Sequence, residues 1–206
     1  MIEVLTSNIP GRLLSADILD SMFQLRSAVF CDRLGWDLET VRGREVDRYD
    51  DLDPTYMVVR ERVQPNVALG SWRLLPTTGP YMLRDVFPEL LDGQPIPADP
   101  RIWEISRYAI ASHGTAAARP GFGFGEISIA MWRRLLTFSR EMGIEAYVGV
   151  TSIAVERLVR KLGLGFDRLG SPRRYGGVPN IAFRIPMDAQ AEAALGAGPH
   201  ETRRAA

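Results

Sequence analysis

Charged side chains of both signs alternate in one polar segment, GREVDRYDD, which spans residues 43–51. It carries the carboxylates Glu45, Asp47 and Asp50, with arginines between them. Grouped carboxylates can bind an ammonium group or a metal ion. The spacing does not fit a calcium loop, which needs a central glycine and a closing glutamate. Taken alone, the segment is more typical of a solvated acidic loop, because runs of charge are usually solvated, and the binding site stays open as the alternative.

A tryptophan stands in the same polar region, where Trp36 follows Gly35. An exposed indole there can stack on a purine or a sulfonium group. The commoner role of a loop tryptophan is to anchor the loop on the core.

Ionisable residues also interrupt apolar segments that have the composition of strands. Glu104 and Arg107 lie in RIWEISRY (101–108), and Arg73 lies in SWRLLP (71–76). Buried charges need partners, so these residues indicate either a site or an ion pair within the sheet. Because Glu104 and Arg107 are three residues apart, a regular strand would point them to opposite faces. Both can serve one site only if a β-bulge intervenes or one side chain reaches around an edge.

A glycine-rich segment, RPGFGFG (119–125), comes directly before a predicted helix. Backbone N–H groups at a helix N-terminus can hold a phosphate. Phe122 stands where the pyrophosphate loop of acyl-CoA acyltransferases has its first glycine, counted from Arg119. The match is weak, and a plain flexible loop explains the segment as well.

Composition restricts the class of protein. The 206 residues suit one domain, and 25 basic residues balance 25 acidic ones, which disfavours a nucleic-acid binder. The single cysteine allows no internal disulfide and, with two distant histidines, makes a Cys/His zinc site improbable. We see no signal peptide and no apolar run long enough to span a bilayer, and we expect a cytoplasmic protein with no metal.

Hydrophobic periodicity predicts a single α/β domain over residues 1–206, with a mixed sheet covered by helices. Residues 32–53 are expected to form a long loop or lid, and the tail from about 188 is expected to fray. Predicted helices span residues 15–31, 80–91, 126–143 and 152–163. Predicted strands span residues 56–63, 68–75, 101–111, 145–151, 166–170 and 180–187.

Several segments in order closely resemble the LuxI-type acyl-homoserine-lactone synthases, or autoinducer synthases. They are RSAVFCDRLGW (26–36), GREVDRYD (43–50), WRLLPTTGPYMLRDVFPEL (72–90), WEISRYAI (103–110) and VGVTSIAVERLVRKLG (148–163). The resemblance implies a GNAT-like acyltransferase fold with a mixed, mostly antiparallel twisted sheet flanked by helices. It also implies transfer of an acyl chain from acyl-acyl carrier protein, or from acyl-CoA, to the amine of S-adenosylmethionine. Lactonisation would then release methylthioadenosine and yield a quorum-sensing signal.

The resemblance also implies roles for individual residues. The catalytic set would be Glu104, Arg107 and Arg73, with Glu104 as general base, acting directly or through a water. Arg107 or Arg26 would pair with the substrate carboxylate, and Asp47 would face its ammonium group. S-adenosylmethionine itself is a substrate, and no permanently bound cofactor is expected. The family's characteristic residues that would shape the S-adenosylmethionine site match Arg26, Phe30, Trp36, Glu45, Asp47, Asp50 and Arg107, and Phe87 matches a further aromatic.

An apolar cleft between splayed strands would hold the acyl chain. A hydroxyl of Thr151 or Ser152 could face an oxygen on the third carbon of the chain, although such hydroxyls more often cap the next helix. The expected lining residues are Met82, Leu83, Trp103, Ile105, Val150, Thr151 and Val155. Basic residues that could steer an acidic carrier protein are Arg133, Arg134, Arg140, Arg157, Arg160 and Lys161.

Two other functions remain open on the sequence. A GNAT-type enzyme could acylate a different amine with acyl-CoA and never use S-adenosylmethionine, but it would have no need of the acidic segment with Trp36. A non-enzymatic signal-binding or scaffold module would have to explain why Glu104, Arg107 and Arg73 all lie in apolar strands. No nucleic-acid or membrane partner is expected.

Overall fold

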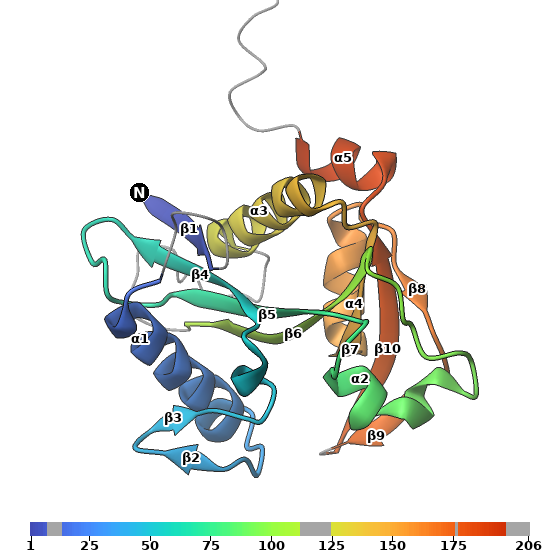
Figure 1. Cartoon of the computed structure of the whole chain (residues 1–206), viewed down its shortest axis with the longest axis horizontal. Coiled ribbons are helices and arrows are strands. Elements are labelled where there is room, and N and C mark those ends of the chain that lie inside the picture. The colour runs from blue at the N-terminus through green and yellow to red at the C-terminus, as the bar shows by residue number, and fades with distance from the viewer. Residues whose placement is uncertain (8–13, 112–124, 176, 197–206) are drawn as a thin grey trace, which may run out of the picture.

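One twisted sheet forms the centre of the computed structural model, which describes residues 1–7, 14–111, 125–175 and 177–196 (Figure 1). Its strand order is β1-β4-β5-β6-β7-β10-β8, and β9 pairs with β10 beside this path. All neighbours are antiparallel except β6 and β7. The predicted mixed, mostly antiparallel sheet is confirmed. The strands are β1 (Ile2–Thr6), β4 (Thr55–Glu61), β5 (Gly70–Pro76), β6 (Ile102–Ile110), β7 (Ala146–Ser152), β8 (Asp167–Arg168), β9 (Arg173–Tyr175) and β10 (Val178–Pro186).

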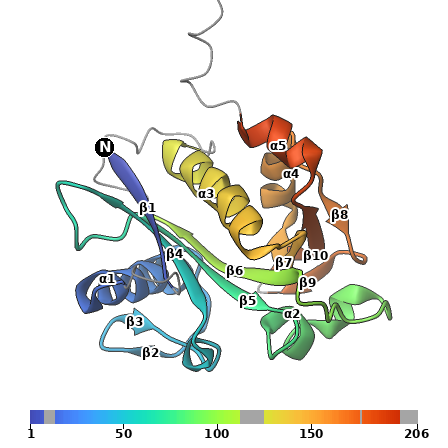
Figure 2. The same cartoon turned by 45° about the horizontal axis from the view of Figure 1, so that its top comes forward.

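Helices cover both faces of this sheet, as Figures 1 and 2 show. Along β4, Met57 and Val59 face one core while Val58 faces the other, as the alternation of a strand requires. The first face packs against α3 (Glu126–Met142), α4 (Ile153–Lys161) and α5 (Ala189–Gly196). The second face carries α1 (Ala16–Ser27), the π-helix η1 (Ala28–Arg33), the 3-10 helices η2 (Asp50–Leu52) and η3 (Pro88–Leu91), and α2 (Met82–Asp85). Within the described ranges, no helix is long and apolar enough to cross a membrane.

Two helix ends lie where the sequence indicates. Ser15 caps α1 by accepting from the backbone N–H of Ile18, and Ile18 and Met22 are fully buried. Helix α3 ends at Gly143, whose φ of 68° is the left-handed conformation that glycine adopts easily.

The two parallel central strands, β6 and β7, separate after their first residues. Strands β6 and β7 pair only from Ile102 to Glu104, opposite Ala146 to Val148. At the point of parting, a Cβ on Gly149 would lie 2.5 Å from the carbonyl oxygen of Ile105, so only glycine fits there. The backbones therefore touch at Gly149 and then diverge, which opens a gap in the middle of the sheet.

A β-bulge in β6 resolves the facing of Glu104 and Arg107. The pairing with β5 shifts between Ser71 and Arg73, and Arg107 has a φ of 55°, which is rare for a residue with a side chain. The extra residue lets Ser106 and Arg107 both turn toward the face that carries α1 and α2. One of the two conditions that the sequence left open is thus met.

The structure corrects several sequence predictions. Residues 32–53 are not loop throughout, since β2 (Thr40–Val41) and β3 (Arg44–Glu45) form a small hairpin and η2 closes the segment. The predicted helix 80–91 is divided into α2 and η3, because Pro88 cannot continue a helix that begins before it. The first part of the tail that was expected to fray forms α5 over Ala189–Gly196, where Ala191 and Leu195 are buried, and residues 197–206 lie outside the described residues.

Besides β2 and β3, two described strands of the main sheet, β1 and β9, were not predicted. β1 shows an apolar alternation, with Ile2 and Val4 packed on the core around α3, and this pattern was present in the sequence. β9 is short and pairs only with β10. All of the glycine-rich segment 119–125 except Gly125 lies outside the described residues.

Candidate active site

Three arginines and three carboxylates meet on the face of the sheet that carries α1. The arginines come from α1, β5 and β6, and the carboxylates come from β3, from the turn before η2 and from the first residue of η2. The sequence predicted each of them as a site residue, and the structure brings all six into one cluster of ion pairs. We call Arg26, Arg73, Arg107, Glu45, Asp47 and Asp50 the ionic cluster.

Arg26 forms the buried end of the ionic cluster. Its Nη1 and Nη2 donate to the two oxygens of Asp50 at 2.8 and 2.9 Å, and its Nε donates to Glu45 at 2.6 Å. This two-pronged geometry is the strongest arrangement for a guanidinium and a carboxylate. Only 1% of Arg26 is exposed, so it holds its partners in place from inside the protein.

Arg73 connects the two aspartates from the middle of β5. Its Nη2 donates to Asp47 at 3.0 Å, and its Nη1 donates to Asp50 at 3.0 Å. Its Nε donates to the hydroxyl of Ser106 at 3.3 Å, and its Nη2 also lies 3.2 Å from the sulfur of Met82. Arg73 is fully buried, so its partners must compensate its charge.

Arg107 lies at the side of the ionic cluster that water reaches. Its Nη2 lies 2.6 Å from Asp47 and 3.0 Å from Glu45. The exposed fraction of the side chain is 8% for Arg107 and 19% for Asp47, compared with 3% or less for Arg26, Glu45, Asp50 and Arg73. Within the ionic cluster, Arg107 and Asp47 are therefore the pair that a ligand can reach.

The surroundings of Asp50 fix its charge. Burial acts to raise its pKa, but the hydrogen bonds and positive charges of Arg26 and Arg73 outweigh burial and hold the pKa well below its usual range. The hydroxyl of Tyr56 donates to Asp50 at 2.6 Å, and the backbone N–H of Asp47 donates at 2.8 Å. Tyr56 was not among the predicted site residues, because a tyrosine in an apolar strand reads as core.

Two stacked aromatic rings lie near Arg107. Phe30 and Trp36 are stacked, with ring centroids 5.0 Å apart and planes 14° from parallel. The guanidinium carbon of Arg107 lies 5.6 Å from the centroid of Phe30. Phe30 is buried, whereas 42% of Trp36 is exposed, so the outer face of this pair is open to a planar or cationic ligand. Phe87 lies elsewhere, edge-on against Tyr175.

Glu104 lies beside the ionic cluster and is almost fully buried. Its two oxygens accept from the backbone N–H groups of Leu83 and Met82 at 2.7 and 3.1 Å, so it caps the N-terminus of α2. Burial raises the pKa of Glu104, and these two N–H groups offset part of that rise. The capping role was not foreseen, since nothing local in the sequence connects residue 104 with residues 82 and 83.

An apolar cavity occupies the gap between β6 and β7. Of the expected acyl-pocket residues, Ile105, Val150, Thr151 and Val155 line it, but Met82, Leu83 and Trp103 do not. Met82 instead contacts Arg73 and Arg107, Leu83 of α2 is buried in the core, and Trp103 packs on Phe138. Its other lining residues are Trp72, Ser106, Arg107, Tyr108, Trp132, Val159, Phe166, Phe183 and Ile185.

Arg107 thus belongs both to the ionic cluster and to the wall of the apolar cavity. A ligand held by Arg107 would therefore have the cavity next to it. Ser152 is not a lining residue of the cavity, and its hydroxyl caps α4 by accepting from the backbone N–H of Val155.

The predicted basic residues of α3 and α4 are mostly paired. Three of them form ion pairs with glutamates: Arg134 with Glu141, Arg140 with Glu192 and Arg160 with Glu156. These pairs reduce the positive electrostatic potential that the arginines present to a partner. Arg133 donates to the carbonyl oxygen of Leu195, while Arg157 and Lys161 are exposed on α4. In the described ranges, no group of three or more potential ligands could hold a metal ion.

The chain is similar to proteins of a known family. The family model described as autoinducer synthase matches residues 11–195. An acyl-homoserine-lactone synthase from Pseudomonas aeruginosa is 38% identical over 181 residues, which is 88% of each chain.

Solved structures share the fold. The crystal structure of the AHL synthase LasI superimposes with a TM-score of 0.83 at 35% identity, covering 96% of this chain and 95% of that one. A CoA-dependent acyl-homoserine lactone synthase, BjaI, solved with SAM and isopentyl-CoA, gives 0.82 at 28% identity, covering 95% and 88%. The chain belongs to the autoinducer synthase family, the acyltransferases named acyl-homoserine-lactone synthases.

Proposed function

We propose that the protein transfers an acyl chain from a thioester to the amine of S-adenosylmethionine and then closes the product to an acyl-homoserine lactone. The observation that carries the proposal is the double position of Arg107, in the ionic cluster and in the wall of the apolar cavity. One pocket can therefore bind a zwitterionic amino acid next to an aliphatic chain. The sulfonium nucleoside occupies the polar side and the acyl chain enters the gap between β6 and β7.

The residues that water reaches bind S-adenosylmethionine. Asp47 faces the ammonium group, and the guanidinium fork of Arg107 pairs with the carboxylate. The outer face of Trp36 packs on the adenosyl group and the sulfonium, backed by Phe30. Arg26, Arg73, Glu45 and Asp50 are too deeply buried to touch the substrate, and they position Asp47 and Arg107.

Acyl transfer forms one bond and breaks one. The amine nitrogen attacks the thioester carbonyl carbon, the C–N bond forms, the C–S bond breaks, and the thiol leaves with a proton. Glu104 accepts the amine proton through a bridging water, and its raised pKa makes it a better proton acceptor than an ordinary carboxylate. Strand N–H groups that lose their partners where β6 and β7 diverge stabilise the oxyanion.

Lactonisation needs no further protein group. The substrate carboxylate attacks its own γ-carbon, the C–O bond forms, and the bond to the sulfonium breaks. Methylthioadenosine leaves as a neutral molecule, so holding the carboxylate near the γ-carbon is the main requirement.

The donor is an acyl-acyl carrier protein or acyl-CoA. Arg157 and Lys161, exposed at α4 beside the cavity residues Val155 and Val159, support docking of an acidic carrier protein there. We expect the reaction to take place in the cytoplasm, where these substrates are made.

One assay tests this function. The purified protein is incubated with S-adenosylmethionine and a panel of acyl-carrier proteins and acyl-CoAs, and thiol, methylthioadenosine and lactone are quantified. Equal amounts of thiol and methylthioadenosine are expected. Thiol release that requires a different amine, without methylthioadenosine, would instead identify an amine N-acyltransferase. No turnover with any donor would leave only a binding module.

A further inference from the structure

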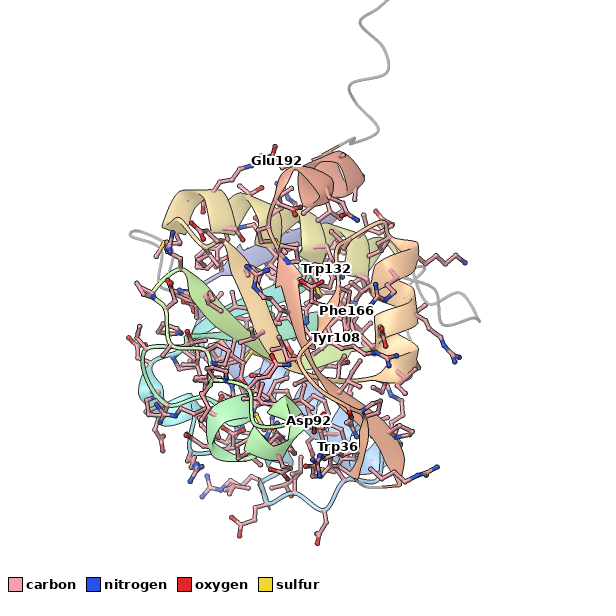
Figure 3. The ribbon with its side chains drawn as sticks, turned by 90° about the vertical axis from the view of Figure 1, so that its right-hand side faces the viewer. Trp36, Asp92, Tyr108, Trp132, Phe166 and Glu192 are labelled. Carbon is pink, nitrogen blue, oxygen red and sulfur yellow. The ribbon has the colours of Figure 1, made fainter. Side chains whose placement is uncertain are left out.

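The wall of the apolar cavity includes Trp132, a side chain whose polar atom has no partner in the described part of the chain. Trp132 projects from α3 and is only 4% exposed, and its indole ring packs edge-on against Trp72 with centroids 4.9 Å apart. Its Nε1 is buried and has no acceptor in the described part of the chain. Figure 3 shows Trp132 in the interior with Tyr108 and Phe166, two other residues of the cavity wall.

Two hydroxyls of the same wall, those of Tyr108 and Ser106, are already paired. The hydroxyl of Tyr108 bonds to that of Ser128 at 2.7 Å, and the hydroxyl of Ser106 accepts from Arg73. An indole N–H can only donate, and a buried donor without an acceptor costs stability. Such a group in a ligand cavity indicates that the ligand supplies the acceptor.

Trp132 lies on the opposite side of the sheet from the ionic cluster. It belongs to the core around α3, whereas Arg107 contacts Glu45 on the face of α1. A chain whose thioester lies near Arg107 passes through the gap between β6 and β7 before it reaches Trp132. The acceptor is therefore on the acyl chain, beyond the thioester carbonyl.

We propose that Trp132 Nε1 donates a hydrogen bond to a carbonyl or hydroxyl oxygen carried by the acyl chain, and so selects oxygen-substituted chains over unsubstituted ones. This inference rests on the proposed function, since it assigns the substrate class of the same cavity. The apolar residues Val155, Val159 and Phe166 enclose the hydrocarbon around that oxygen.

The test compares Trp132→Phe with the unaltered protein on acyl donors of equal length. The donors are unsubstituted or carry an oxo or hydroxy group at successive carbons from the third outward, and kcat/KM is measured for each. The unaltered protein should prefer one oxygen-substituted donor. Trp132→Phe, which keeps the aromatic shape and loses the N–H, should reduce that preference about fivefold. Trp103→Phe is the matched control, because its Nε1 donates to Pro100 outside the cavity, and it should leave the preference unchanged.

Two results would overturn the inference: a preference unchanged in Trp132→Phe, or an equal loss of kcat/KM on every donor, which would place the bond at the thioester carbonyl.

A second measurement does not depend on turnover. In ¹⁵N-labelled protein, the indole N–H resonance absent from the Trp132→Phe spectrum should shift with an oxygen-substituted acyl thioether and not with the unsubstituted one. Equal shifts would also refute it. Failure of the proposed function itself is distinguishable, since the unaltered protein would then release no methylthioadenosine with any donor.

Discussion

Replacing Asp50 with asparagine tests whether the ionic cluster is a buried, mutually compensating network. Asp50 accepts hydrogen bonds from Arg26, Arg73, Tyr56 and the backbone of Asp47, and its side chain is 3% exposed. The Asp50→Asn variant keeps the shape and removes the charge that faces two buried guanidinium groups.

The expected loss is large for a single substitution. Removing one partner of a buried ion pair costs about 3–5 kcal/mol, because the charge left behind is uncompensated. For a domain of this size such a loss lowers Tm by roughly 10 °C.

Two control variants are compared with Asp50→Asn. Glu192→Gln disrupts an ion pair with Arg140 in which both side chains are more than half exposed, and it should cost less than about 1 kcal/mol. Asp47→Asn should cost less stability than Asp50→Asn and more S-adenosylmethionine affinity, because water reaches Asp47.

Urea unfolding followed by circular dichroism gives the free energy of unfolding for each variant, and calorimetric titration gives the affinity. A loss for Asp50→Asn as small as that for Glu192→Gln would refute the reasoning. So would a pattern in which Asp47→Asn is the more destabilising aspartate variant.

Three further predictions follow from the same structure. Because the pKa of folded Asp50 lies below its ordinary value of 3.8, its ion pairs stabilise the protein fully above that pH and are lost as the pH falls below it. The free energy of unfolding of the Asp50→Asn variant should therefore fall less steeply below that pH than that of the unaltered protein. Equal slopes of unfolding free energy against pH would contradict this. Glu104→Gln should slow acylation roughly 100-fold while S-adenosylmethionine still binds, measured by single turnover and by titration, and unchanged turnover would remove Glu104 as the base. Gly149→Ala should destabilise the fold by about 1–3 kcal/mol, since its Cβ would lie 2.5 Å from the oxygen of Ile105. A free energy of unfolding in urea that does not decrease would show that β7 can shift without cost.

The sequence predicted those parts of the fold that depend on local patterns. Helix α3 and strand β7 lie where apolar periodicity and Gly143 indicated, because each pattern acts within one element. Pro88 also indicates that residues 80–91 cannot form one helix, although the prediction treated them as one. The small hairpin of β2 and β3 is stabilised by its contacts with α1, and a polar segment carries little sign of such contacts.

The site was predicted as a set of residues but not as a geometry. Nothing marks Arg107 as the position with positive φ, since glycine or asparagine would be the usual signal for a bulge of that kind. Glu104 caps α2 across 21 residues of sequence separation, which no local pattern reveals. Trp132 read as an ordinary core residue of an amphipathic helix, and only the three-dimensional surroundings show that its N–H lacks a partner.

A crystal structure with S-adenosylmethionine and an acyl thioether analogue tests the central claim most directly. We expect the substrate carboxylate on Arg107, its ammonium nitrogen within about 3–3.5 Å of the carbon that stands for the thioester carbonyl, and the chain in the gap between β6 and β7. A structure in which the nucleoside binds elsewhere, or in which the chain lies on the surface while the gap stays closed, would contradict the account.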